Sequence, residues 1–332
     1  MKIVADNKIP FLKGLLEPVA QEVDYVPGAQ ITAATVRDAQ VLLTRTRTRC
    51  NSALLEGSQV QFIGSAAIGT DHIDLDYCRQ HDITVATAPG CNAPAVAQWV
   101  HASILLWRRV RKISRTLTLG IVGAGHVGSI VAQWAQQLGY RVLLNDPPRA
   151  QREGEEAFVD LATVQRESDI ITFHTPLTRD GEHPSWHLCD EHFLSHLQRC
   201  RLILNAARGA VCDTQALLQW HGDLAIDCWE NEPNINRHLL DKAFIATPHI
   251  AGYSLQGKQR ATAMIIEALN KHYDWDIKPQ QASTPLKGAA SVTAASIAAS
   301  YDPLHDTSLL KLSPAAFETL RNTYPLRNEV DD

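Results

Sequence analysis

Three short motifs in the second half of the chain carry an arginine, several carboxylates and a histidine that could act together on an alcohol beside a carboxylate. They are N-A-A-R-G at 205–209, E-N-E-P at 230–233 and P-H-I-A-G at 248–252. The guanidinium of Arg208 could hold a carboxylate and polarise a nearby oxygen. The imidazole of His249 could accept a hydroxyl proton near neutral pH, and one of the carboxylates within 227–232 could orient that ring and stabilise its protonated form. This inventory indicates hydride transfer at a 2-hydroxy acid.

A glycine-rich motif indicates the hydride acceptor. G-A-G-H-V-G at 123–128 follows the apolar run 119–122 and opens an apolar helix, and Asp146 ends the next predicted strand. In this context the glycines permit a tight turn, and the free N–H groups at the start of the helix can hold a pyrophosphate. Asp146 could accept hydrogen bonds from ribose hydroxyls and repel a 2′-phosphate, which favours NAD over NADP. The expected NAD contacts here are Gly123, Gly125, His126, Val127, Gly128 and Asp146. The alternative is that the glycines only serve the turn and Asp146 caps the loop at 147–148.

The elements that must position these motifs alternate regularly. Apolar runs predict strands at 119–122, 141–145, 170–174, 202–205, 224–227 and 244–246, with helices between them. Such alternation is typical of a parallel sheet covered on both faces, which binds ligands at the carboxyl ends of its strands. Nearer the amino terminus we predict strands at 2–5, 41–44, 60–63 and 85–87, a helix beginning at 11–16 and a helix from Asn92 towards Arg111. A long helix is predicted at 261–272 and an amphipathic one at 315–324.

Composition restricts the class of protein. The 332 residues include 31 Lys and Arg against 36 Asp and Glu, a formal net charge of −5, so no electrostatic footprint for nucleic acid is expected. No apolar run is long enough to cross a membrane, and the polar start of the chain does not resemble a signal peptide. The seven scattered cysteines suit a reducing compartment, so we expect a cytoplasmic protein.

The ordered motifs give the chain a family resemblance. G-x-G-x-x-G, N-A-A-R-G, E-N-E-P and P-H-I-A-G resemble the D-isomer-specific 2-hydroxyacid dehydrogenase family, and the likeness covers nearly the whole chain. The resemblance implies NAD as cofactor. It also implies that Arg208 binds substrate, that Glu232 supports the histidine and that His249 is the acid/base.

A narrower likeness concerns the segments 88–93, 145–150, 172–177 and 249–254. They are similar to a branch of the family that oxidises a small phosphorylated 2-hydroxy acid on the route to pyridoxal phosphate. This likeness implies that Thr46 and Tyr253 contact substrate. Ala67 stands where a threonine that touches substrate is expected, so only its main-chain N–H could serve. Gln98 and Cys228 replace an expected Glu and Val. The likeness further implies cofactor contacts from Thr175, Ala206, Ala207, Arg208, Asp227 and Gly252.

The expected fold is α/β, with two Rossmann-like, doubly wound parallel-sheet domains. Residues 1–95 and 253–279 would form a discontinuous substrate-binding domain, and residues 96–252 the NAD-binding domain. Residues 280–332 would form a shortened dimerisation segment. The hydrophobic residues of 315–324 lie at helical spacing and must pack against something. Because the resemblance suggests a second subunit there, we expect a homodimer.

Two further features suggest other ligands. Arg45, Arg47 and Arg49 alternate and, if extended, would share one face and could cradle a phosphate. The alternative is a solvated basic turn, and only Arg45 is kept as a candidate substrate contact. The histidines and cysteines of 183–200 are dense enough to suggest zinc, but they lack a metal-site spacing. We therefore favour a polar surface helix and expect no metal.

Two other functions fit parts of this pattern. One is a different D-2-hydroxyacid dehydrogenase, of the glyoxylate or hydroxypyruvate reductase type. The other is an NAD-sensing binding protein that uses the same fold without turnover. The presence of Arg208, Glu232 and His249 together argues against pure sensing.

Overall fold

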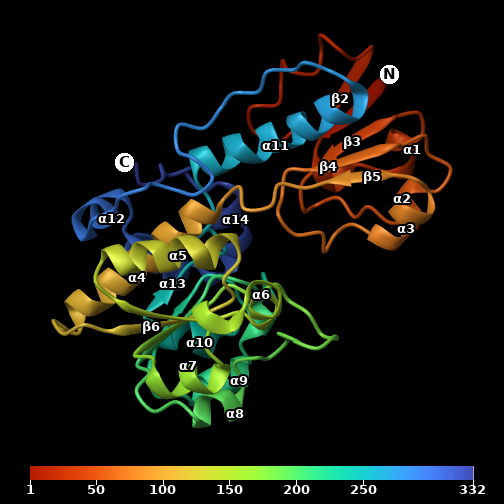
Figure 1. The fold of residues 1–332 in the computed structure, drawn as a ribbon. Helices are drawn as coiled ribbons and strands as arrows, with labels where there is room; N and C mark the ends of the chain where they lie inside the picture. Colours follow the sequence, from red (N-terminus) through yellow and green to blue (C-terminus); the bar gives the residue numbers. More distant parts are fainter. Residues whose placement is uncertain (332) are drawn as a thin grey trace. The chain divides into compact units, whose positions relative to one another are not determined.

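The computed structural model describes residues 1–331 and divides the chain into two compact units (Figure 1). The first consists of Met1–Asn92 and Leu255–Leu286. The second consists of Ala93–Ser254 and the chain from Lys287 onward. Each unit is built on its own parallel sheet.

The first unit has a five-stranded sheet in the order β2-β1-β3-β4-β5. Alternate residues of a strand point to opposite faces, so each strand serves two separate cores. On β1, Ile3 and Ala5 pack towards α11, whereas Val4 packs towards the side covered by α1, α2 and α3. Figure 1 shows α11 on one face of this sheet and the short helices on the other. The strands are β1 (Lys2–Asp6), β2 (Glu22–Val26), β3 (Val41–Thr44), β4 (Phe62–Ser65) and β5 (Thr84–Ala86), and the helices are α1 (Ala33–Val36), α2 (Ser52–Leu55), α3 (Leu75–Gln80) and α11 (Leu255–Tyr273).

The second unit has a six-stranded sheet in the order β11-β10-β9-β8-β6-β7. The helices α4 and α5 cover one face, with Trp99, Trp107 and Trp134 buried among them. The other face packs against α7 to α10 and against Leu310 and Phe317 of the terminal segment. All the strands run parallel, and the order in which they are added reverses between β6 and β8, which is where doubly wound sheets bind nucleotides.

The elements of the second unit have the following bounds. The strands are β6 (Thr118–Val122), β7 (Arg141–Asn145), β8 (Ile170–Phe173), β9 (Leu202–Asn205), β10 (Asp223–Ile226) and β11 (Ile245–Ala246). The helices are α4 (Ala93–Val110), α5 (His126–Gln137), α6 (Pro147–Glu153), α7 (Leu161–Glu167), α8 (Glu191–Ser195), α9 (Thr214–Gln219), α10 (Arg237–Lys242), α12 (Ala294–Ser300), α13 (Pro303–Leu312) and α14 (Phe317–Asn322).

The predicted α/β class with two parallel sheets is confirmed, but two local predictions are wrong. Residues 11–16 form successive turns rather than the start of a helix, because Phe11 and Gly14 have φ values of 60° and 93°. Strand β4 begins two residues later than the apolar run 60–63 suggested. Strand β2 was not predicted because its sequence, E-V-D-Y-V, alternates polar and apolar residues at the sheet edge and lacks the continuous apolar run of the other strands.

The terminal segment contains the helices α12, α13 and α14, and it packs against the rest of the second unit. Phe317 is 1% exposed within the core of the second unit, so the apolar stripe of 315–324 finds its cover in its own chain. The stripe therefore gives no evidence for a second subunit. The exposed apolar side chains of this segment lie instead on α13, where Leu304, Leu309 and Leu312 are 37%, 39% and 81% exposed.

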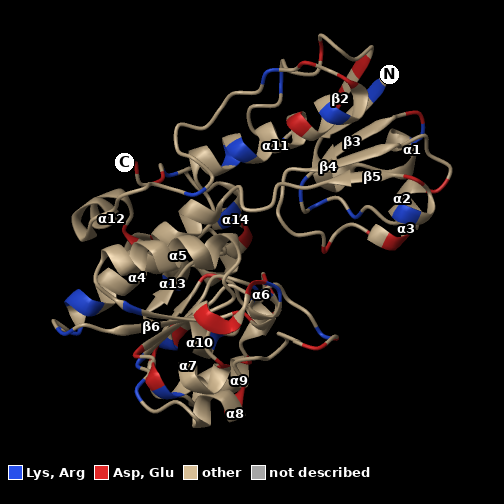
Figure 2. Cartoon of the chain, viewed as in Figure 1, with Lys and Arg blue, Asp and Glu red and all other residues tan. Residues whose placement is uncertain are grey.

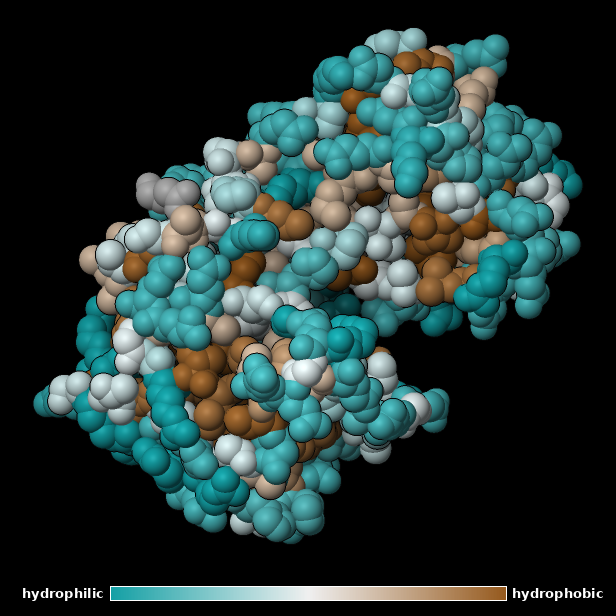
Figure 3. Space-filling view, viewed as in Figure 1, coloured by the Kyte–Doolittle hydropathy of each residue, from teal (hydrophilic) through white to brown (hydrophobic). Residues whose placement is uncertain are grey.

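The chain is mixed in charge, and the face shown in the figures is mostly hydrophilic. Blue and red segments are interspersed on both units in Figure 2, and Figure 3 shows apolar residues only as patches among hydrophilic ones. Within residues 1–331, no helix has both the length and the apolar character that a membrane span requires.

Candidate active site

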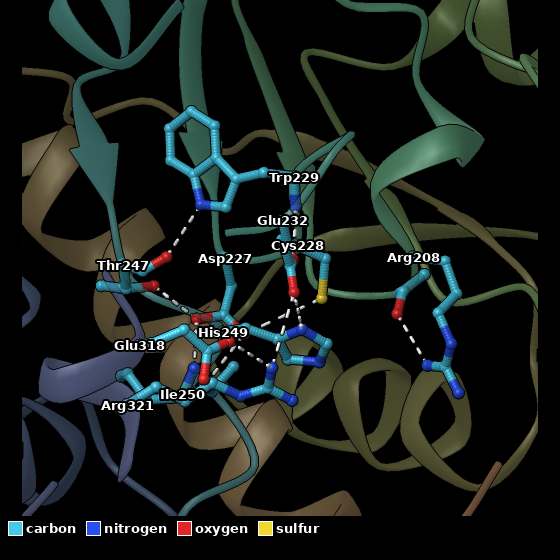
Figure 4. Close-up of polar contacts among 12 residues, drawn as sticks. Arg208, Asp227, Cys228, Trp229, Glu232, Thr247, His249, Ile250, Glu318 and Arg321 are labelled. Carbon is cyan, nitrogen blue, oxygen red and sulfur yellow. Dashed lines mark hydrogen bonds and ion pairs between the residues drawn. The ribbon is translucent and has the colours of Figure 1, made fainter. Parts of the chain in front are cut away.

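The three catalytic motifs follow three neighbouring parallel strands. N-A-A-R-G follows β9, E-N-E-P follows β10, and P-H-I-A-G follows β11, and these strands are adjacent in the order β11-β10-β9. The carboxyl ends of parallel strands meet at one edge of a sheet, so the motifs are brought to the same place. Figure 4 shows that Glu232 and His249 face each other there, with Arg208 set apart from them.

His249 and Glu232 form the pair that the family resemblance implied. The ring Nδ1 of His249 lies 2.8 Å from Oε2 of Glu232, and both side chains are largely buried, at 28% and 17% exposed. This contact leaves the ring Nε2 as the nitrogen that can exchange a proton with a ligand. The backbone of His249 has a φ of 56°, a left-handed conformation that is uncommon for residues other than glycine. Such a conformation persists only when its neighbours hold it, and it occurs often at functional sites.

Asp227 holds the turn that carries His249. Its carboxylate is fully buried and accepts hydrogen bonds from the Thr247 hydroxyl at 2.6 Å and from the N–H groups of Ile250 and Ala251 at 2.8 and 3.0 Å. Burial raises the pKa of Asp227, and these donors and the nearby imidazole oppose that rise. The N–H of His249 donates to the main-chain oxygen of Asp227 at 2.9 Å. The structure therefore gives Asp227 a clear role in fixing the histidine, while its expected contact with the cofactor stays a prediction.

Glu232 is held as a carboxylate. Its Oε1 accepts the N–H of Trp229 at 2.8 Å, while Oε2 faces His249 and lies 3.8 Å from Nη1 of Arg321. Burial alone would raise the pKa of Glu232. The hydrogen bond and charge of His249, the N–H of Trp229 and the Arg321 guanidinium outweigh that effect and lower the pKa below its ordinary value. An ionised Glu232 can stabilise an imidazolium, as the proposed chemistry needs.

The loop that carries Arg208 is shaped by two neighbours. The side-chain amide of Asn205 donates to the main-chain oxygen of Arg208 at 2.9 Å and accepts the N–H of Ala207 at 3.1 Å. The next residue must be glycine, because a Cβ on Gly209 would lie 2.0 Å from the main-chain carbon and oxygen of Trp229. The R-G pair is thus a steric requirement of the site as well as a sequence motif.

The catalytic side chains line one pocket of about 310 Å³ within the second unit. Arg208, Glu232 and His249 lie in its wall, together with Glu230 and Trp229. Arg179 and Trp186 form another part of the wall, and the Arg179 guanidinium lies over the Trp186 ring at 5.0 Å. The pocket therefore presents two guanidinium groups and an acid/base histidine to a small ligand. Arg179 and Trp186 belong to no motif, so neither could be recognised as a pocket residue from the sequence.

The glycine motif builds a cradle that fits a dinucleotide. Gly123 has a φ of 91°, and a Cβ there would lie 2.7 Å from the main chain of His174. A Cβ on Gly128 would lie 2.0 Å from the main-chain oxygen of Gly123, whereas one on Gly125 would meet nothing within 4 Å. Gly123 and Gly128 are thus needed for the fold, and Gly125 leaves open space in front of the first turn of α5. His126 and Val127 are the first two residues of that helix.

Buried polar atoms beside the cradle lack a partner. Thr175 Oγ1 and His174 Nδ1 are both buried without a hydrogen-bond partner among the described residues. Burial lowers the pKa of His174 to about 3, so that ring is neutral. Buried polar atoms are normally satisfied, and a bound ligand would satisfy these. This observation agrees with NAD in the cradle and with the expected role of Thr175. Ala206 and Ala207 directly follow β9, and Gly252 lies in the turn after β11, where the other expected contacts fall.

Asp146 lies where a ribose contact is expected. Its Oδ2 accepts the N–H of Ala124 at 2.8 Å, and its Oδ1 caps α6 by accepting the N–H of Arg149 at 3.0 Å. Asp146 therefore caps α6, as the alternative interpretation expected, and it also lies beside the glycine motif. Arg149 is paired with Glu153 through Nε at 2.9 Å and Nη2 at 2.6 Å. This pairing weakens Arg149 as a site for a 2′-phosphate.

The candidate substrate contacts of the first unit lie in two loops after its strands. Residues 45–49 follow β3 in a turn and a bend rather than in an extended run, so the shared face that an extended run would give Arg45, Arg47 and Arg49 is not formed by a strand. The Nε of Arg45 donates to the buried carboxylate of Asp6 at 3.0 Å. Ala67 follows β4, and its main-chain oxygen accepts the N–H of Ala88 at 3.0 Å. The substrate contacts expected of Arg45, Thr46 and Ala67 stay predictions.

Tyr253 and Cys228 flank the catalytic pair. The Tyr253 hydroxyl accepts a hydrogen bond from Nε of Arg321 at 3.3 Å. Cys228 lies close enough to Glu232 and His249 for the three to hold a metal, as do His187, Asp213 and Glu230 elsewhere in the described residues. Glu230 is already bonded to His187 at 2.8 Å and to the N–H of Thr214 at 2.9 Å, so that second group is satisfied without an ion.

Comparisons with known proteins agree with this site. The family model for the NAD-binding domain of D-isomer specific 2-hydroxyacid dehydrogenases matches residues 92–251. The chain is 47% identical to erythronate-4-phosphate dehydrogenase of Bacteroides thetaiotaomicron, over 99% of this chain and 97% of that protein. It is 40% identical to the protein of the same name from Pseudomonas entomophila, over 100% of this chain and 93% of that one.

Solved structures show the same fold. NAD-bound 3-phosphoglycerate dehydrogenase of Entamoeba histolytica matches with a TM-score of 0.68 at 23% identity, covering 84% of this chain and 98% of that one. D-lactate dehydrogenase of Aquifex aeolicus, complexed with NAD and lactic acid, matches with a TM-score of 0.67 at 23% identity, covering 82% and 96%. The fold and the site thus define an NAD-dependent oxidoreductase. The chain belongs to the D-isomer specific 2-hydroxyacid dehydrogenase family, within which its relatives at 47% and 40% identity are erythronate-4-phosphate dehydrogenases.

Proposed function

We propose that this protein oxidises 4-phospho-D-erythronate to 3-hydroxy-2-oxo-4-phosphooxybutanoate with NAD, a step in pyridoxal phosphate biosynthesis. The observation that carries the proposal is the single pocket in which Arg208 and the Glu232–His249 pair lie together. The substrate assignment rests on the relatives at 39–47% identity, which bear the name of that activity.

The residues divide the work as follows. Neutral imidazole at His249 takes the proton of the C2 hydroxyl through Nε2, because Nδ1 is engaged by Glu232. The Glu232 carboxylate then stabilises the imidazolium. Arg208 holds the substrate carboxylate and the developing carbonyl oxygen with its two N–H edges. NAD, held by the glycine cradle and Asp146, supplies the hydride acceptor. As a general base alone, His249 would contribute roughly 10²–10⁴-fold to the rate.

The phosphate of the substrate needs a cationic partner. Arg179 lines the same pocket as Arg208, and no carboxylate among residues 1–331 pairs with it. Arg45 keeps its Nη atoms for a ligand although its Nε is bonded to Asp6. Thr46, Ala67 and Tyr253 complete the proposed substrate contacts, with Ala67 able to contribute only main-chain groups.

A substrate panel tests this proposal. Purified protein would be assayed with NAD and 4-phospho-D-erythronate, D-erythronate, D-glycerate and D-lactate, and in reverse with glyoxylate and hydroxypyruvate plus NADH. We expect the highest kcat/KM for 4-phospho-D-erythronate. A higher value for glyoxylate or hydroxypyruvate would assign the protein to another activity of its family. NADH binding without turnover of any compound would support an NAD-sensing role instead.

Assembly and location form a further part of the proposal. We expect a cytoplasmic homodimer, because α13 exposes three leucines and the seven cysteines are free and mostly buried. Light scattering at micromolar concentration measures the mass directly. The variant Leu309→Glu/Leu312→Glu should be monomeric if α13 forms the interface, and a monomeric unsubstituted protein would contradict the assembly.

A further inference from the structure

An arginine from the terminal segment reaches the catalytic pair. Arg321 lies on α14, and its Nη1 is 3.8 Å from Oε2 of Glu232, the same oxygen that faces His249. Its Nε donates to the Tyr253 hydroxyl at 3.3 Å, and its side chain is only 20% exposed. Figure 4 shows the Arg321 guanidinium beside Glu232 and His249, with Glu318 next to it on the same helix.

The terminal segment is fastened to the turn that follows His249. The guanidinium of Arg327 donates to the main-chain oxygens of Ile250 at 3.1 Å, of Tyr253 at 3.2 Å and of Ala251. It also donates to the side-chain oxygen of Gln98 at 3.0 Å. The Ser254 hydroxyl donates to the buried Glu329 at 2.6 Å. These contacts tie the segment to the catalytic turn, so the place of Arg321 beside Glu232 is fixed from both sides.

The charge of Arg321 acts on the pair in a definite direction. Burial would lower the pKa of Arg321, but Tyr253, Glu232 and Glu318 outweigh it, so the pKa is raised and the side chain stays charged. The Glu232 carboxylate is therefore shared between Arg321 and the imidazole. The charge of Arg321 keeps Glu232 ionised. It also limits how strongly Glu232 stabilises the imidazolium of His249, which must give up its proton before the next turnover.

Other charged and titratable groups also face the pair. Asp227 and Cys228 lie next to the pair, directly after β10. The charge of Arg208 acts to lower the pKa of the Cys228 thiol. Glu318 lies 3.9 Å from Nη1 of Arg321 on α14. Burial raises the pKa of the Cys228 thiol well above its usual value, so it stays neutral. Among the described residues, Arg321 and His249 are the two cationic or titratable basic groups within 4.0 Å of the Glu232 carboxylate.

We propose that Arg321 is a positioning residue for the Glu232–His249 pair, and that the terminal segment is part of the catalytic machinery through it. This inference rests on the proposed dehydrogenase function. It gives the segment a task that is independent of assembly, since every contact involved lies within one chain.

The test compares three single variants. Arg321→Met removes the charge, Arg321→Lys restores a cation, and Lys311→Met is the matched control. Lys311 is a cation of the same segment that anchors it to the main-chain oxygens of Ala243 and Asp241, at 2.6 and 3.2 Å, without touching Glu232. The measurements are kcat/KM for hydroxy-acid oxidation across pH and the melting temperature of each variant.

In Arg321→Met the acidic limb of the pH–rate profile should move to higher pH by roughly 0.5–1 unit, since Glu232 then serves the imidazolium alone. The kcat should fall about tenfold, because the carboxylate loses one of the groups that position it. Arg321→Lys should return the limb towards its original position. Lys311→Met should lower the melting temperature and leave the limb unchanged.

Two results would overturn the inference. One is an Arg321→Met profile that coincides with the unsubstituted one. The other is a shift in Lys311→Met as large as that in Arg321→Met, which would show a purely structural effect. If the unsubstituted protein oxidises no hydroxy acid, the proposed function fails. Proton uptake by the Glu232–His249 pair, followed through the histidine ring signals in NMR spectra, still decides the role of Arg321 in that case.

Discussion

Replacing Glu232 by glutamine separates the charge of this residue from its shape. The carboxylate accepts two hydrogen bonds, one at Oε1 from the Trp229 N–H and one at Oε2 from Nδ1–H of His249, each at 2.8 Å. Glutamine has one oxygen and one NH₂ group, so it can satisfy only one of these donors. Whichever way the amide turns, either the ring loses its acceptor or the Trp229 N–H faces another donor.

The magnitude follows from the lost contact. A hydrogen bond to a charged group contributes about 1.5–3 kcal/mol, and the interaction strengthens when the imidazole becomes charged in the transition state. At about 1.4 kcal/mol for each factor of ten, Glu232→Gln should lower kcat roughly 10–100-fold. Because the imidazolium loses its counter-charge, the acidic limb of the pH–rate profile should also move to lower pH. This direction is opposite to that expected for Arg321→Met.

The assay follows NADH formation with saturating NAD across the pH range in which the protein is stable. Asp169→Asn is the matched control. Asp169 is a buried carboxylate of the same unit that accepts a hydrogen bond from Arg115 at 2.6 Å and from the Thr118 N–H at 2.9 Å, and it does not line the pocket. The control should lose stability and keep its pH profile. A near-normal kcat in Glu232→Gln, together with an unmoved acidic limb, would refute the claim that the Glu232 carboxylate controls the basicity of His249.

Four further single substitutions and one double variant test other parts of the site. Arg208→Lys should raise KM for the hydroxy acid with a smaller effect on NAD binding, because an ammonium cannot make the two-pronged carboxylate contact; equal weakening of both ligands in steady-state kinetics would contradict that role. Gly209→Ala should destabilise the fold by about 1–3 kcal/mol in denaturant unfolding, because its methyl group meets the Trp229 main chain. Gly125→Ala should instead leave stability nearly unchanged and raise KM for NAD, and a large stability loss there would contradict the open cradle. Asp146→Ser should gain little activity with NADP, because Glu153 still holds the Arg149 guanidinium. The double variant Asp146→Ser/Glu153→Gln should gain more activity with NADP, because Arg149 is then available for the 2′-phosphate. Equal NADP kinetics in the two variants would count against this account of cofactor choice.

Much of the fold and the pair of Glu232 and His249 could be predicted from the sequence, because both depend on local signals. Each motif follows an apolar run, and parallel strands bring their carboxyl ends together whatever the intervening length. Asp227 was expected to line the cofactor, but its burial beneath Thr247 and the 249–251 turn depends on three-dimensional packing. No spacing rule would have indicated it.

The contribution of the terminal segment could not be predicted for a different reason. Arg321 lies 72 residues after His249 and 89 after Glu232 in the numbering, and its neighbours form no motif. The apolar stripe at 315–324 correctly required a packing partner, but the pattern does not distinguish the same chain from a second subunit. Likewise, the helical expectation at 11–16 failed because apolar spacing says nothing about the positive φ values of Phe11 and Gly14.

The central claim is that His249 is the base that accepts the hydroxyl proton, and His249→Ala tests it most directly. The measurement is the rate of NAD reduction by 4-phospho-D-erythronate at neutral pH, with NADH affinity determined by titration on the same preparation. Turnover should fall by roughly 10²–10⁴-fold, while NADH affinity and the melting temperature stay close to those of the unsubstituted protein. Near-normal oxidation by His249→Ala with intact NADH binding would require another base and contradict the account.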